Sequence, residues 1–140
     1  MTAPRNVLLA YVDGSDLDGI ADRLQLRFQD FASGRAWKAA EVSVVNMRQP
    51  PDPSDAPEDL PQWDLGLNFT LPDRDQNDEN WKDDVRATVD FLSRLNEEFG
   101  RDFVIAVHDR VRGFNEDVGY VASEPPNLEM IYFMIDAHRA

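Results

Sequence analysis

Residues 63–71 read WDLGLNFTL, and their alternation decides how this chain folds. One side of the pattern carries Trp63, Leu65, Leu67, Phe69 and Leu71, while the residues between them are polar or small. Successive side chains of a β-strand point to opposite faces, so the segment predicts a strand with one buried face. Such a strand needs an apolar layer packed against that face.

Apolar periodicity on both sides of this segment predicts four more strands and three helices. The expected strands cover residues 6–13, 40–47, 103–107 and 117–122, with a polar turn over 108–115. The expected helices cover residues 17–32, 79–99 and 128–138, with Asp16 and Asn127 as N-caps and Gly34 and Gly100 as stop signals. Residues 6–13, NVLLAYVD, are apolar on both faces, which predicts a central strand covered on both sides.

The order of these elements, β-α-β-β-α-β-β-α, predicts an α+β protein with two layers. Its first six elements match the split βαβ arrangement of the ferredoxin-like fold. We therefore expect helices packed on a mixed, mostly antiparallel sheet, with the first and fourth strands as parallel neighbours. The length favours a single globular domain over residues 1–140. Within it, residues 49–62 hold five prolines, which exclude a regular ladder and predict an acidic loop.

Negative charge is concentrated in residues 49–84. This segment holds eleven acids and two bases, so it contributes −9 to a chain whose formal net charge is −13. Such a field attracts a cationic partner and repels phosphate backbones and anionic lipid, so we expect a basic protein partner and no direct contact with nucleic acid or membrane. The predicted partner-binding residues are Asp52, Asp55, Glu58, Asp59, Asp64, Asp73, Asp75, Asp78 and Glu79.

The leading functional hypothesis is a small, non-enzymatic inhibitor or immunity-type protein that neutralises a basic partner such as a toxin. The sequence has no cysteine, no phosphate-binding glycine motif and no zinc ligand set, so we expect neither a cofactor nor a metal. A calcium loop beginning at Asp73 is disfavoured, because its sixth position needs glycine and holds Asp78. No apolar run resembles a signal peptide or a membrane span, so the expected location is the cytoplasm.

Two alternatives stay open. In the first, the ends of the first and fourth strands bring Asp13, Asp16, His108 and Asp109 together as the site of a metal-dependent hydrolase or another enzyme. In the second, the protein is an oligomeric structural or assembly subunit. Its last helix is apolar almost all round, so the helix is either well buried or in contact with another chain.

Overall fold

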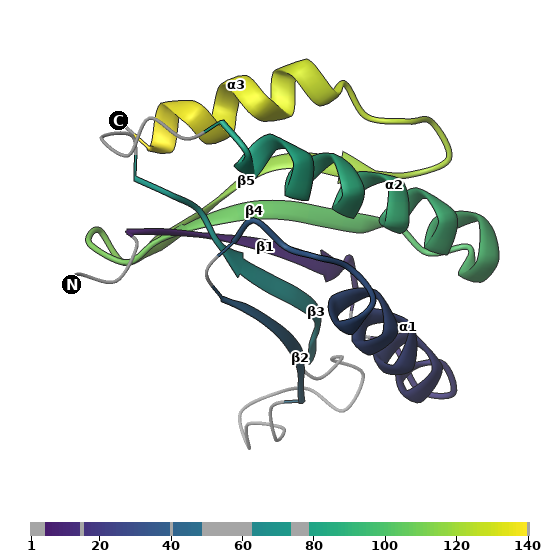
Figure 1. Cartoon of the computed structure of the whole chain (residues 1–140). Coiled ribbons are helices and arrows are strands. Elements are labelled where there is room, and N and C mark those ends of the chain that lie inside the picture. Colours follow the sequence, from purple (N-terminus) through teal and green to yellow (C-terminus); the bar gives the residue numbers. More distant parts are fainter. Residues whose placement is uncertain (1–4, 15, 40, 49–62, 74–78, 140) are drawn as a thin grey trace.

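A computed structural model of the chain describes residues 5–14, 16–39, 41–48, 63–73 and 79–139 (Figure 1). Its elements, in chain order, are β1 (Asn6–Val12), α1 (Ala21–Ser33), β2 (Val42–Arg48), β3 (Trp63–Thr70), α2 (Trp81–Phe99), β4 (Phe103–Asp109), β5 (Phe114–Val121) and α3 (Leu128–His138). Within the described residues, the predicted number and order of elements are confirmed. The acidic loop expected at residues 49–62 lies outside the described residues.

The five strands form one sheet in the order β2-β3-β1-β4-β5. Each neighbouring pair is antiparallel, so the α+β class is confirmed while the expected mixture of parallel and antiparallel pairs is wrong. With β5 at one edge and α3 as a third helix, the whole chain departs from the four-strand ferredoxin-like order. β1 is the central strand, as its apolar sequence predicted.

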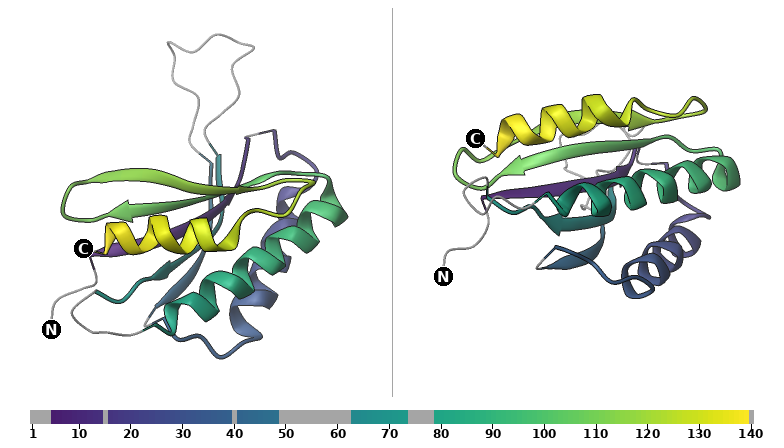
Figure 2. Two further views of the ribbon diagram at one scale, coloured as in Figure 1. Left: turned by 90° about the horizontal axis from the view of Figure 1, so that it is seen from above. Right: turned by 45° about the horizontal axis from the view of Figure 1, so that its top comes forward.

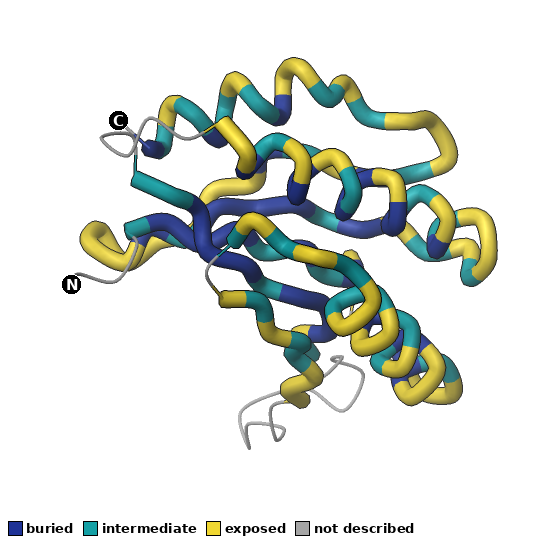
Figure 3. Tube along the Cα trace, in the orientation of Figure 1, coloured by how far each residue is buried: buried dark blue, intermediate teal, exposed yellow. Residues whose placement is uncertain are grey.

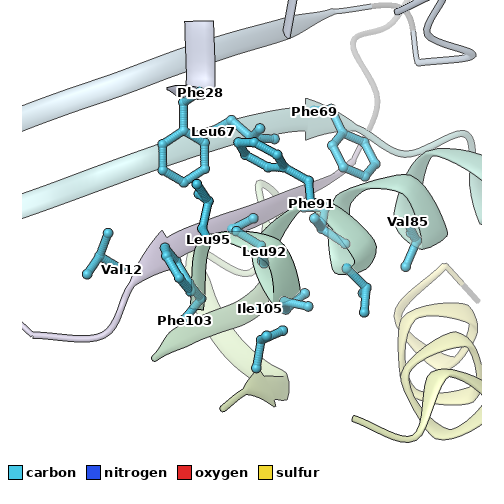
Figure 4. Close-up of a cluster of buried hydrophobic side chains, with 14 of the residues drawn as sticks. Val12, Phe28, Leu67, Phe69, Val85, Phe91, Leu92, Leu95, Phe103 and Ile105 are labelled. Atoms are coloured by element: carbon cyan, nitrogen blue, oxygen red, sulfur yellow. The ribbon is translucent and has the colours of Figure 1, made fainter. Parts of the chain in front are cut away.

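All three helices pack against the same face of the sheet (Figure 2). Leu8 of β1 stands opposite Phe69 of β3 and Val107 of β4, so these side chains share one face. That face meets Phe28 of α1, and Figure 4 shows α2 side chains directed at the strands. Further members of this cluster are Ala10, Val12, Leu65, Leu67, Phe91, Leu92, Leu95, Phe103, Ile105, Ile131 and Ile135. The sheet is therefore covered on one side by a helical layer.

Helix α1 begins at Ala21, four residues later than predicted. The N–H groups of Ile20 and Ala21 both donate to the carbonyl of Leu17, which closes a turn ahead of the helix. Gly19 has φ of +88°, a conformation that interrupts a right-handed helix. Asp16 is therefore not the N-cap, and its side chain forms an ion pair with Arg101 instead.

The hairpin of β4 and β5 is longer than its polar sequence predicted. His108 pairs with Asn115 and Asp109 with Phe114, so only residues 110–113 are left to form the turn. Cross-strand polar pairs therefore extend the ladder where the composition alone favoured a loop. The ladder is irregular between Ile105 and Ala106. Ile105 lies opposite Gly119 and Ala106 lies opposite Asp117, so Val118 is the extra residue of a β-bulge.

Helix α3 begins after Asn127, as predicted, and the Asn127 side chain accepts a hydrogen bond from the Met130 N–H at 3.1 Å. Ile131 and Ile135 are buried against the sheet, whereas Met130 and Phe133 are 53% and 72% exposed. The tube in Figure 3 shows buried and exposed residues alternating along this helix. The helix is thus half buried, so part of its apolar surface faces solvent.

Candidate functional site

The opposite face of the sheet carries no helix in the described part of the chain, and we call it the open face. Strand alternation and the cross-strand register place its side chains. The open face consists of Val7, Leu9, Tyr11, Ser43, Val45, Met47, Asp64, Gly66, Asn68, Thr70, Val104, Ala106, His108, Asn115, Asp117 and Tyr120. No described helix covers this second face of β1, although the β1 side chains on it, Val7, Leu9 and Tyr11, are buried or half-buried.

Tyr11 lies at the centre of the open face, because Gly66 leaves room for its ring. A Cβ atom built on Gly66 would lie 2.6 Å from Tyr11 Cδ1, so only glycine allows this close approach. The Tyr11 hydroxyl donates to Asn68 Oδ1 at 2.6 Å, which fixes the ring across β3. Burial raises the pKa of Tyr11 by more than the hydrogen bond to Asn68 lowers it, and the nearby charge of Asp64 adds to the increase.

A second tyrosine stands at the other side of this face. Tyr120 lies opposite Val104, which itself lies opposite Tyr11, so the three side chains form one row across β1, β4 and β5. Tyr120 is 55% exposed, and its hydroxyl donates to Asp117 Oδ2 at 2.6 Å. That hydrogen bond raises the pKa of Tyr120. Two oriented phenol groups on an apolar row provide large, rigid contact area, as protein-binding surfaces commonly do.

The charge of the open face is negative. Its strand residues, all of which the structure describes, include the acids Asp64 and Asp117, while none of them is lysine or arginine. Asp64 and Asp117 are exposed on β3 and β5, and Tyr11 and Val104 of the row lie on the two strands between them. The face therefore combines an aromatic and aliphatic centre with an acidic rim, an arrangement that suits a cationic protein surface and opposes nucleic acid.

Three of the nine predicted partner-binding acids fall within the described residues. Asp64 is on the open face, as described above. Asp73 accepts a hydrogen bond from the Arg5 backbone N–H at 3.3 Å, and Glu79 forms an ion pair with Lys82 at 2.9 Å. The other six, Asp52, Asp55, Glu58, Asp59, Asp75 and Asp78, lie outside the described residues. Of these three acids, Asp64 alone lies on the open face.

The alternative catalytic group is not brought together. The hypothesis required β1 and β4 to be parallel. They are antiparallel, so Asp13 and His108 lie at opposite ends of the sheet. His108 stands opposite Val7, six residues before Asp13, a separation of about 20 Å along a strand. The expected convergence is wrong, because β1 and β4 run in opposite directions.

Three members of that group, Asp16, His108 and Asp109, have structural partners instead. Asp109 is buried and accepts hydrogen bonds from Arg5 Nε at 3.2 Å and from the backbone N–H groups of Val111 and Arg112 at 2.9 and 3.0 Å. The Arg5 hydrogen bonds, assisted by those N–H groups, hold the pKa of Asp109 far below its usual range. His108 Nδ1 lies 2.6 Å from Asn115 Oδ1. The Asp109 contacts hold the turn after β4 against the residue before β1, and the His108 contact joins β4 to β5.

A second exposed surface lies along α3. Met130, Phe133 and Ala137 are exposed at helical spacing, and Met134 beside them is half-buried. Next to this stripe is a hollow of about 240 Å³, lined by Arg5, Asp109, Arg112, Glu116, Phe133, Met134, Ala137 and His138. Glu116 and His138 are 3.2 Å apart across it. The acids and bases that line this hollow pair with each other. The most distinctive feature of this second surface is therefore the apolar stripe on α3.

Two further observations on the described residues concern metal binding and membrane-spanning helices. Among them, no three histidine or acidic side chains lie close enough to hold a metal ion. None of the helices in the described ranges has the length and apolar character needed to cross a membrane. Comparison with known proteins adds nothing to these observations, since no family model, no curated protein and no solved structure matches the chain.

The sequence patterns did not predict the two tyrosines of the open face. Tyr11 was assigned to a strand covered on both sides, and Tyr120 to a short hairpin strand. One signal was present: Gly66 interrupts the polar side of an otherwise regular alternating strand, and a glycine in a strand often marks the close approach of another group. The identity of that group depends on strand order, which local patterns do not give.

Proposed function

We propose that this protein is a non-enzymatic binding domain whose open face captures a basic protein. The observation that carries the proposal is the composition of that face, where Tyr11 and Tyr120 occupy an apolar row with Asp64 and Asp117 on its rim and no lysine or arginine among its strand residues. We further propose that β1 to β4 with α1 and α2 act as a ferredoxin-like scaffold that presents this surface.

An inhibitor or immunity-type role fits this surface. Negative charge concentrated in residues 49–84 would steer a cationic partner and raise its association rate. The tyrosines would then supply the affinity that charge alone does not, because buried aromatic anchors dominate binding energy. In the sequence, Asp52, Asp55, Glu58 and Asp59 lie between β2 and β3, and Asp64 is the second residue of β3. Occlusion of the partner's cationic site would neutralise it.

The test compares two doubly substituted proteins with the same change in net charge. The first carries Asp64→Asn and Asp117→Asn on the open face. The second carries Asp90→Asn and Glu97→Gln, two exposed acids of α2 on the helical side of the molecule. Each is used as bait for partners from the source organism, and the association rate of any captured protein is measured at low and high salt. A third bait in which Asp52, Asp55, Glu58 and Asp59 are amides measures the contribution of residues 49–62.

We expect the open-face variant to capture no partner, or to bind it with an association rate at least about tenfold lower. The α2 variant should behave as the wild type. Equal loss in both variants would show that only net charge matters. Unchanged capture by the open-face variant together with unchanged capture by Tyr11→Ala and Tyr120→Ala would exclude this face as the binding surface.

The stripe on α3 supports a second candidate, an assembly subunit. Phe133 is the most exposed large apolar side chain of the helix, and exposed apolar stripes commonly mark contacts between chains. Sedimentation of the isolated protein over a range of concentrations tests this role. Self-association that Phe133→Ser abolishes and Leu26→Ser preserves would support it, since Leu26 is an exposed apolar residue of α1 and serves as the matched control. A monomer at every concentration would rule out a homo-oligomer formed through α3.

A further inference from the structure

Strand β2 is an edge of the sheet, and no strand among the described residues pairs with its outer row of backbone groups. The Thr70 N–H donates to the Glu41 carbonyl at 3.1 Å, which fixes the phase of the ladder between β2 and β3. Hydrogen-bonded and non-hydrogen-bonded pairs alternate along an antiparallel ladder. Ser43, Val45 and Met47 therefore bond to β3, whereas the N–H and C=O groups of Val42, Val44 and Asn46 point away from the sheet.

The two edges of the sheet differ in how well they are protected against another strand. β5 has a bulge at Val118 and the acids Glu116 and Asp117, features that discourage pairing at an edge. β2 reads VSVVNMR and pairs with β3 over seven consecutive positions without a bulge. It contains no proline or lysine, and its single charge is at its last residue. An edge that is regular, rich in valine and unprotected is a template for strand addition.

We propose that β2 accepts an extended cationic segment of the basic partner as a sixth strand. This inference rests on the proposed function, since it names how the partner would engage the sheet. The added strand would form hydrogen bonds with Val42, Val44 and Asn46, and its alternate side chains would continue the open face beyond Val45 and Met47.

The charges around β2 favour a cationic segment. Asp64 stands opposite Met47 on the neighbouring strand, so a basic side chain added beside Met47 would be about two strand spacings, or about 10 Å, from it. Glu41 precedes the strand and is exposed. The one base of β2, Arg48, lies 3.7 Å from an Asp18 carboxylate and 4.8 Å from the centre of the Trp63 ring, so intramolecular contacts already engage it.

A second copy of this chain is a poorer occupant. Its net charge of −13 opposes the approach of an identical molecule. A twofold pairing of β2 with itself, centred on Val45, would place valine against valine and Ser43 against Met47, so it would add no opposite charges on the open face. The cationic segment is therefore favoured on electrostatic grounds.

The test follows backbone amide hydrogen exchange by NMR as a synthetic peptide is added to the full chain. The probe alternates lysine and valine over seven residues. One control peptide has glutamate in place of lysine, and another has proline in place of the central valine. Of the three peptides, only the lysine peptide should slow amide hydrogen exchange at Val42, Val44 and Asn46. Exchange at Ser43 and Val45 should not change, because the ladder with β3 already protects those amides.

Two variants separate backbone pairing from side-chain contact. Val44→Pro removes an N–H that points away from the sheet, whereas Val44→Ala loses a comparable side chain and keeps that N–H. We expect Val44→Pro to weaken peptide binding by at least about fivefold relative to Val44→Ala, since one hydrogen bond is lost. Thermal unfolding of both variants checks that the fold is retained, and exchange protection in the wild type decides the matter if Val44→Pro does not fold.

Three results would overturn the inference. The first is slowed exchange on the open face without the alternating pattern on β2. The second is equal protection by the glutamate peptide. The third is protection of β2 in the protein alone, with a sedimentation mass of two chains, which would make a second copy the occupant. In the first case capture of a basic protein through the open face could still hold, so failure of strand addition is distinguishable from failure of the proposed function.

Discussion

Arg5 and Asp109 form an ion pair, with 2.9 Å between Arg5 Nη2 and Asp109 Oδ2, that joins the start of β1 to the end of β4. The two residues are 104 positions apart in the sequence, and the antiparallel pairing of their strands brings them to the same end of the sheet. A carboxylate proposed as a catalytic group is thus a structural one. Its role is to hold the first strand and the turn after β4 together.

The ion pair predicts a specific dependence of stability on pH. The folded-state pKa of Asp109 lies below the value of about 3.9 for an unperturbed aspartate, because Arg5 and two backbone N–H groups stabilise the charged form. A group with a lowered folded-state pKa stabilises the fold above its unfolded pKa and loses that contribution as pH falls through the folded value. We therefore expect Asp109→Asn to lower Tm at pH 7, and the difference from wild type to shrink below about pH 4.

Thermal unfolding followed by circular dichroism between pH 2 and 7 checks this prediction. Glu97→Gln is the matched control, because Glu97 is exposed on α2 and removing its charge should shift Tm little at any pH. A constant Tm difference between Asp109→Asn and the wild type across the whole range would show that the charge of Asp109 is not what stabilises this turn.

Asp84 predicts a large effect in the first turn of α2. Its buried carboxylate accepts hydrogen bonds from Arg35 Nη2 at 2.7 Å and from the backbone N–H groups of Lys38 and Ala39 at 3.1 and 2.8 Å. Removing one partner of a buried pair leaves the remaining groups unsatisfied, so Asp84→Ala should lower the free energy of unfolding by about 3 kcal/mol. Urea denaturation measures it. Asp83→Ala removes an exposed acid from the same turn and should cost less than about 1 kcal/mol; equal losses would contradict the buried role.

The fold could be predicted from the sequence where a local pattern was sufficient. The alternation in residues 63–70 and the apolar stripe before Gly100 gave a strand and a helix close to their observed bounds. Strand order could not be read in this way, because it depends on contacts between distant residues. The hypothesis that Asp13 and His108 meet failed because β4 runs antiparallel to β1. No property of either segment alone contains that direction.

The candidate site was predictable only in its charge. Asp64 was selected for its place in an acidic segment, and the structure puts it on the open face. Tyr11 and Tyr120 come from strands that are far apart in the sequence, and they align in one row because both strands pair with β4. The sequence could show that an aromatic residue belongs to a strand, but a surface made of several strands exists only once the register is known.

Gly66 predicts how sensitive the open face is to shape. A methyl group at this position would overlap the backbone carbonyl of Ala10 and the ring of Tyr11. Because backbone atoms cannot move aside cheaply, we expect Gly66→Ala to destabilise the protein by about 2 kcal/mol and to shift the Tyr11 ring resonances. Ser43→Ala, a small change at an exposed position of the same face, should do neither. Urea denaturation and NMR measure both effects, and a stable Gly66→Ala protein with unmoved Tyr11 signals would contradict the close approach.

The two sides of α3 predict opposite results from apolar substitutions two residues apart. Ile135 is fully buried in the core, so Ile135→Ala should lower the free energy of unfolding by about 2–4 kcal/mol through lost burial and the cavity that remains. Phe133 is 72% exposed, so Phe133→Ala should change it by no more than about 0.5 kcal/mol. Urea denaturation at several protein concentrations measures both. A stability that depends on concentration in the wild type and not in Phe133→Ala would mean that Phe133 is buried in an assembly, because association stabilises the folded state by mass action. A large loss for Phe133→Ala at every concentration would instead contradict the placement of this side chain in solvent.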